Sequence, residues 1–415
     1  MAHPFADLLR DRRIGALWIG LGFSAFGNEL GRIAMVWLAI GLVGPDAGFL
    51  PMAQNAVVLA VSLGAGLISH RLQPRATMIG ADIASAVIAV APVIIALVWG
   101  LTFWSLVASA MCLAALSALF QPALYSTVPH VAGSPARIQG VNALFDATNR
   151  MARLVGPFAA GPLAAILPVV HFLTVNALTF AASAAAIAAI GRKIDPPPMA
   201  PDTMSAGQRL MRGMRIVADR PATRAMLVAN AIVLAAWMIG VALGLPFLVA
   251  AYEITGFGLS GLGAVAALVA AYGAGDFLSN LFVAGHRPRR LGRFMFGGYF
   301  LLGAALAVVP LPLWLLPDGF RLPAMMAAAF VSGLGGPMFF IPMMTFLQTN
   351  LAGQDLVSVI RLRLAVIAGA MMIGSGLAPL LYAHVGSGLS VVAAGIVIAA
   401  TAGWGLWRHG EISAA

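Results

Sequence analysis

The stretch that decides the fold runs from residue 14 to residue 41 and reads IGALWIGLGFSAFGNELGRIAMVWLAIG. It is longer than the roughly 20 apolar residues that a helix needs to cross a bilayer. Arg10, Arg12 and Arg13 precede it, but its length and its internal charges do not fit a cleaved signal peptide. The stretch therefore predicts a membrane-spanning helix that is retained in the protein.

The composition of the whole chain agrees with this prediction. Of its 415 residues, 61% are hydrophobic and 9% are charged, whereas soluble domains carry about a quarter charged residues. This composition excludes a soluble globular protein and a disordered one. The single cysteine, Cys112, excludes an internal disulfide and a cysteine metal cluster. Because Cys112 lies in an apolar run, we expect it to be a small buried packing residue.

Eleven further apolar runs of membrane-spanning length follow the first one. We therefore predict an all-α integral membrane protein with twelve transmembrane helices. The predicted spans are residues 14–41, 51–69, 76–98, 101–121, 141–167, 171–191, 224–250, 259–284, 293–316, 323–349, 360–383 and 388–407.

Basic residues set the predicted orientation. If both termini are cytoplasmic, the inner segments hold twenty of the 24 lysines and arginines, Arg361 and Arg363 included, and the outer loops hold only Arg321. An excess of basic residues in cytoplasmic loops is the usual pattern of membrane proteins. We expect a multi-pass protein of the plasma (inner) membrane. The net charge of +10 then indicates contact with anionic lipid and does not indicate a nucleic-acid partner.

One long polar stretch divides the chain into two halves of six spans. It begins with four prolines among residues 196–201, which cannot continue a helix. Residues 205–219 then predict an amphipathic helix, either on the inner leaflet or in a solvated linker. The predicted parts are an N-terminal six-helix half (1–191), a cytoplasmic linker with the amphipathic helix (192–223) and a C-terminal six-helix half (224–415).

The two halves contain matching short motifs at offsets between 209 and 220 residues. This agreement favours a duplicated six-helix unit with parallel halves and a ligand site near the bilayer midplane between them. The matching pairs are Gly64-Ala65-Gly66 with Gly273-Ala274-Gly275, Phe120-Gln121-Pro122 with Phe340-Ile341-Pro342, Ala160-Gly161-Pro162-Leu163 with Leu377-Ala378-Pro379-Leu380, and the GxxxG pairs Gly27/Gly31 and Gly240/Gly244.

The arrangement resembles the major facilitator superfamily over essentially the whole chain. That superfamily carries a loop of the form Gly-x-x-x-Asp-Arg-x-Gly-Arg-Arg after its second span, and residues 66–75 here read GLISHRLQPR. Gly66, Arg71 and Arg75 match the motif, and the resemblance implies that they take part in gating. His70 replaces the aspartate, so the gating role of that acidic position does not carry over.

Span 5 contains RLVGPFAAG at residues 153–161, which looks like the Gly-Pro motif of antiporting exporters. Gly156, Pro157 and Gly161 would then form a hinge or seal, although a fixed kink is the simpler interpretation. Residues 120–123, 128–129 and 141–143 resemble the branch that contains siderophore and macrolide exporters, such as enterobactin exporters. The resemblance implies export by antiport.

Charged residues inside the first span are energetically unfavourable in a bilayer, so their presence there indicates a structural or functional role. Asn28, Glu29 and Arg32 fall near the predicted midplane, where a charge costs about 2.5–3.5 kcal/mol on insertion scales. Glu29 and Arg32 are three residues apart and can touch on one helix face. The pair is either a structural ion pair or a carboxylate whose proton affinity changes with access.

A second charged group lies in span 5. Asn142, Asp146, Arg150 and Arg153 are spaced by four, four and three residues, which places them on one helix face. We expect Asp146 to pair with Arg150. Arg153 is then either an anchor to a neighbouring helix or a contact for a ligand or for Glu29.

The second half carries fewer charges in its predicted spans. Asp276 is its only one, and we expect it to act as a latch between helices or to the following basic loop. We infer that polar recognition lies mainly in the first half. Trp237 and residues 338–340 would supply an apolar wall for amphipathic ligands, or simply pack in the core.

No nucleotide-binding, catalytic or metal-binding motif occurs in the chain, so we expect no cofactor and no metal and predict a non-enzyme. We predict a monomeric secondary transporter that exports a small amphipathic or anionic molecule, such as a drug, siderophore or metabolite, in exchange for protons. A lipid or lysolipid flippase on the same scaffold is the alternative, and a membrane sensor or enzyme is a remote one. The residues expected to take part are Glu29 and Asp146 for proton coupling; Asn28, Arg32, Arg150, Arg153 and Trp237 for substrate binding; and Gly66, His70, Arg71, Arg75, Gly156, Pro157, Gly161 and Asp276 for gating or structure.

Overall fold

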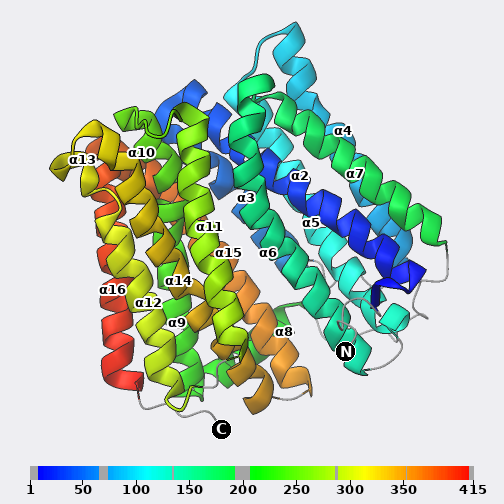
Figure 1. Ribbon diagram of the computed structural model, residues 1–415. Coiled ribbons are helices and arrows are strands. Elements are labelled where there is room, and N and C mark those ends of the chain that lie inside the picture. The colour runs from blue at the N-terminus through cyan, green and yellow to red at the C-terminus, as the bar shows by residue number, and fades with distance from the viewer. Residues whose placement is uncertain are drawn as a thin grey trace. The chain divides into compact units, whose positions relative to one another are not determined.

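The computed structural model describes residues 8–64, 73–132, 135–191, 206–285, 288–351 and 353–410. Long helices dominate these residues (Figure 1). Extended pairing in the described part of the chain is limited to isolated bridge residues, among them Gly256 and Leu259, which pair in a loop. The all-helical prediction is therefore confirmed.

The chain separates into two compact units. The first contains residues 1–42 and 60–206, and the second contains residues 43–59 and 207–415. The helices that lie mainly in the first unit are α2 (Arg12–Val43), α4 (Pro74–Val98), α5 (Phe103–Ala132), α6 (Pro135–Ile166) and α7 (His171–Ile190). The helix α3 (Phe49–Gly64) is divided between the units.

The second unit begins with a short 3-10 turn, η1 (Gly44–Gly48), and the first part of α3. These residues pack on α15: Gly48 lies against Pro379, and Gly376 lies against Met52. The sequence analysis did not foresee that this segment joins the second unit. The remaining elements are α8 (Ala206–Ala218), α9 (Pro221–Trp237), the π-helical turn η4 (Met238–Ala242), α10 (Gly244–Tyr252), α11 (Gly261–Gly285), α12 (Leu291–Val308), α13 (Pro312–Leu315), α14 (Asp318–Asn350), α15 (Gly353–His384) and α16 (Ser387–His409).

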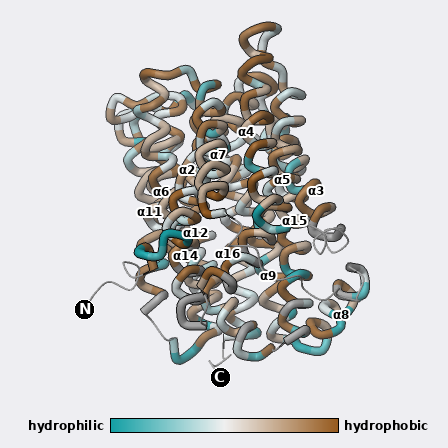
Figure 2. The backbone as a smooth tube through the Cα atoms, turned by 90° about the vertical axis from the view of Figure 1, so that its right-hand side faces the viewer, coloured by the Kyte–Doolittle hydropathy of each residue, from teal (hydrophilic) through white to brown (hydrophobic). Residues whose placement is uncertain are grey.

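Ten helical runs in the described residues are long and apolar enough to cross a membrane. In this set α2, η1 and the start of α3 form one run, and α6 is not included. Figure 2 shows the long helices mostly in the brown of hydrophobic residues, whereas α8 carries teal, hydrophilic segments. The protein is therefore a multi-pass membrane protein, and the number of twelve spans stays a prediction.

The predicted amphipathic segment forms α8 and packs on the start of α15. Arg212 pairs with Asp355 at 2.7 Å, and a Cβ at Gly213 would lie 2.7 Å from the Ser358 carbonyl oxygen. Met211 and Met214 remain exposed on α8. The helix thus has one face that packs on protein and one face that carries exposed methionines.

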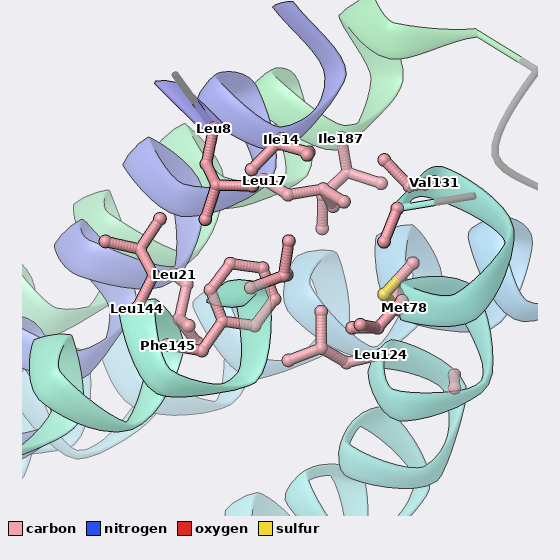
Figure 3. Close-up of a cluster of buried hydrophobic side chains, with 14 residues drawn as sticks. Leu8, Ile14, Leu17, Leu21, Met78, Leu124, Val131, Leu144, Phe145 and Ile187 are labelled. Atoms are coloured by element: carbon pink, nitrogen blue, oxygen red, sulfur yellow. The ribbon is translucent and has the colours of Figure 1, made fainter. Parts of the chain in front are cut away.

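The core of the first unit forms at one end of its helices (Figure 3). Buried side chains from α2, α4, α5, α6 and α7 meet there, so one apolar cluster holds five helices together. Its labelled members are Leu8, Ile14, Leu17, Leu21, Met78, Leu124, Val131, Leu144, Phe145 and Ile187.

Cys112 is exposed on α5, and the expectation that it is buried is wrong. Met111 and Trp104 are exposed on the same helix. In a membrane protein the outer surface is itself apolar, so an apolar run of sequence does not indicate burial in protein.

The two GxxxG pairs make corresponding contacts, one within each unit. On α2, a Cβ at Gly27 would lie 2.9 Å from Asn176 Oδ1, and one at Gly31 would lie 2.7 Å from Asn176 Nδ2 on α7. In the second unit, Gly240 and Gly244 lie against Ala394 and Val391 of α16 in the same way. Small residues allow such close helix contact. The correspondence supports the predicted internal duplication.

The contact of α2 with α7 predicts a stability difference between two glycine variants. Gly27→Ala should destabilise the protein by about 1–3 kcal/mol, because the new methyl group clashes with Thr179 and Asn176. Gly80→Ala is the matched control, because a Cβ there meets nothing within 4 Å. Thermal unfolding in detergent should show a lower transition temperature for Gly27→Ala alone. Equal transition temperatures would contradict the packing argument.

Candidate functional site

The polar residues of α2 form an ion pair on one helix face. Arg32 donates from Nε (3.0 Å) and Nη2 (2.7 Å) to Glu29 Oε2. The contact predicted from their spacing is therefore present. The Glu29 side chain is 15% exposed and that of Arg32 is 46% exposed. The carboxylate is thus largely covered, while the guanidinium stays open to a further partner.

Helix α6 covers the other side of Glu29. A Cβ at Gly156 would lie 2.7 Å from the Glu29 Cβ and 3.6 Å from its Cγ. Any residue larger than glycine would push α2 and α6 apart at this point. Gly156 and Pro157 are buried, Gly161 is half-buried, and α6 stays helical through Pro157. The Gly-Pro motif therefore creates room for the carboxylate.

Arg153 lies one helical turn before Gly156 and is exposed. The exposed apolar residues of α6 nearby are Met151, Val155 and Phe158. Because each residue turns an α-helix by about 100°, these three lie roughly 140–160° around α6 from Arg153. Arg153 is therefore turned away from the apolar face that suits lipid. It makes no ion pair with the side chains that the structure describes.

The same arrangement is found on α2. Asn28 and Arg32 are exposed, and so are the apolar residues Ile19 and Phe23. Ile19 and Phe23 lie roughly 140–180° around the helix from the two polar residues. Exposed polar groups opposite a lipid-compatible face are typical of helices that line a hydrated route.

Several predicted site residues lie outside what the structure describes. Asn142 and Asp146 are in α6, but their side chains lie outside the described part of the chain, so the Asp146–Arg150 pair stays a prediction. Arg150 itself is half-buried. Of the predicted gating motif, Gly66, His70 and Arg71 fall outside the described residues.

The described gating candidates make structural contacts. Arg75 donates from Nη2 to the Ala188 carbonyl oxygen at 2.9 Å, which joins the start of α4 to the end of α7. In the second unit, Asn280 donates to the Asp276 backbone oxygen at 3.0 Å. Gly336 of α14 lies close to Asp276 as well, because a Cβ there would be 3.7 Å from Oδ1.

The predicted apolar wall of the second unit is only partly exposed. Phe339 is fully buried and stacks on Tyr299 with ring centroids 3.9 Å apart, so it is a core residue. Met338 and Trp237 are half-buried. Trp237 donates from Nε1 to the Tyr272 hydroxyl at 2.9 Å. Phe340 is exposed.

Arg363 was counted with the cytoplasmic segments, although the predicted span 360–383 contains it. In the structure it is buried in α15, within a membrane-compatible run of this helix. Its guanidinium lies over the Phe340 ring, 4.9 Å from the centroid. The inference that polar recognition lies mainly in the first half stays a prediction. The spacing of Arg361 and Arg363 was an available signal, because residues two apart point to different sides of a helix.

No protein-family model matches the chain. Among curated proteins, the chain is similar to the multidrug efflux pump Tap of Mycolicibacterium fortuitum, with 26% identity over 222 residues. The match covers 51% of this chain and 54% of the efflux pump, so it spans about half the length of that relative.

Solved transporter structures match nearly the whole chain. A POT family transporter in complex with 5-aminolevulinic acid superimposes with a TM-score of 0.75 at 14% identity and covers 96% of both chains. The POT family transporter PepTSo gives a TM-score of 0.71 at 12% identity, covering 96% of this chain and 99% of that one. A bacterial homologue of the human lysosomal transporter Spinster gives 0.65 at 14% identity, covering 95% and 96%.

These likenesses are to transporters, and the POT family has the major facilitator fold. At identities this low the structural matches establish the fold alone. They bear out the fold that the resemblance to the major facilitator superfamily implied. The chain is a multi-pass membrane protein that shares the fold of the solved POT family transporters.

Proposed function

We propose that the protein is a proton-coupled secondary transporter that exports a small amphipathic or anionic molecule by alternating access. It would work in the plasma membrane with both termini in the cytoplasm. The observation that carries the proposal is the environment of Glu29. This carboxylate is largely covered, paired with Arg32 and packed against Gly156 of α6. The similarity to an efflux pump supports export.

The Glu29–Arg32 pair offers a physical route from protonation to conformational change. A proton on Glu29 removes the negative charge that holds Arg32, and an anionic substrate on Arg32 competes with the same carboxylate. Either event weakens the pair. Because Glu29 also packs on α6, loss of the pair alters the contact of α2 with α6. Arg153, exposed one turn from Gly156, would bind the same substrate.

Removing the titratable carboxyl group should uncouple transport. Glu29→Gln keeps the shape of the side chain but cannot exchange a proton, so flux driven by an imposed pH gradient should fall at least tenfold. The assay uses proteoliposomes, with 2-naphthalenesulfonate as the anionic probe and its trimethylammonium analogue as the cationic one. Glu253→Gln, at the exposed end of α10, is the matched control.

A wild-type flux that does not depend on the pH gradient, or a Glu29→Gln flux equal to that of the wild type, would contradict the proposal. Movement of lysolipid without pH dependence would favour the flippase alternative instead.

The close approach of α6 makes a second variant informative. Gly156→Ala places a methyl group 2.7 Å from the Glu29 Cβ, so α2 and α6 must separate locally. We expect coupled transport to fall more strongly than it does in Gly80→Ala, whose new Cβ meets nothing within 4 Å. Gel filtration of both proteins confirms that they remain folded. Equal transport by the two variants would show that this contact does not matter for coupling.

A further inference from the structure

Arg363 is a charged side chain buried within the second unit. It is 7% exposed and lies in a membrane-compatible stretch of α15. Among the described residues no carboxylate forms an ion pair with it. Its Nε atom is buried and has no hydrogen-bond partner in the same part of the chain. A buried guanidinium without a counter-charge is strongly unfavourable unless a partner is supplied.

Two aromatic residues of the described part of the chain interact with Arg363. Its guanidinium lies over the ring of Phe340 at 4.9 Å. Tyr299 lies near enough to interact with it electrostatically, but its hydroxyl donates to Asn230 Oδ1 at 2.7 Å. A phenol carries no negative charge at neutral pH. These two groups stabilise a cation weakly and, among the described residues, do not compensate its charge.

Arg363, its two aromatic partners and Asn230 come from four helices and lie at a similar distance from the helix ends. Asn230, Tyr299 and Arg363 lie eight to ten residues after the first residues of α9, α12 and α15, and Phe340 lies ten before the end of α14. At 1.5 Å per residue, each is roughly 12–15 Å along its helix. A polar layer therefore crosses the second unit well inside its helices.

Phe340 lies at the exposed edge of this layer. The residue is 36% exposed, in contrast to the buried Phe339 beside it. Stacking on Phe340 uses the face of the guanidinium, while the N–H groups lie in its plane and suit the oxygens of a carboxylate, sulfonate or phosphate. An amphipathic anion could place its charge at Arg363 and its apolar body on Phe340.

We infer that Arg363 and Phe340 form an anion-binding subsite of the second unit, which takes the acidic group of an amphipathic substrate. The inference rests on the proposed transport function and narrows its substrate class. It makes Arg363 a residue that selects anions over cations of the same shape.

Binding to the protein in lipid nanodiscs tests this subsite. The probes are 2-naphthalenesulfonate and its trimethylammonium analogue, which share a ring and differ in charge, with empty nanodiscs to subtract partitioning into lipid. We expect saturable binding of the sulfonate only. Arg363→Gln should weaken this binding at least tenfold, and Arg363→Lys should weaken it less. Arg361→Gln, an exposed arginine on the same helix, should stay within twofold of the wild type.

The inference is overturned if the wild type does not bind the sulfonate, if the cation binds equally well, or if Arg363→Gln binds as the wild type does. Should Arg363→Gln fail to fold, the comparison of the two probes and the Arg363→Lys variant still decide. Arg363-dependent binding without proton-driven flux would refute the proposed coupling alone. Proton-driven flux together with sulfonate binding that is unchanged in Arg363→Gln would refute the subsite alone.

Discussion

The cost of holding an ionised side chain within the long helices of a membrane protein governs this structure. Such a charge must find a counter-charge, water or a ligand. The chain uses a different solution at each of three places. Glu29 is paired with Arg32, Arg153 is exposed away from the lipid-compatible face of α6, and Arg363 is buried against an aromatic ring. Each solution leaves a guanidinium with capacity to bind an anion.

Glycine makes the first of these arrangements possible. Gly27 and Gly31 bring α2 close to α7, and Gly156 brings α6 against Glu29. A proton that changes the charge at Glu29 therefore acts where two helices are in close contact. Electrostatics and packing meet at one residue, which is why we propose Glu29 as the coupling site.

The sequence was sufficient for the fold and for local pairs, but not for the tertiary surroundings of single residues. The length of the apolar runs predicts spanning helices, and a separation of three residues predicts the Glu29–Arg32 contact, because both follow from helix geometry. Cys112 and Phe339 look alike in sequence, since each lies in an apolar run, yet one is exposed and the other is buried. The burial of Arg363 was not predicted, because the positive-inside rule assigns arginines near a span end to the loop, and its contact with Phe340 depends on how α14 and α15 pack.

The central claim, that Glu29 takes up the coupling proton, is tested most directly by infrared difference spectroscopy of the reconstituted protein between acidic and alkaline pH. The account predicts a carbonyl band from a protonated carboxylic acid that disappears in Glu29→Gln and shifts in Arg32→Lys. A band that is unchanged in Glu29→Gln would show that another carboxyl group carries the proton, and the mechanism built on the Glu29–Arg32 pair would be wrong.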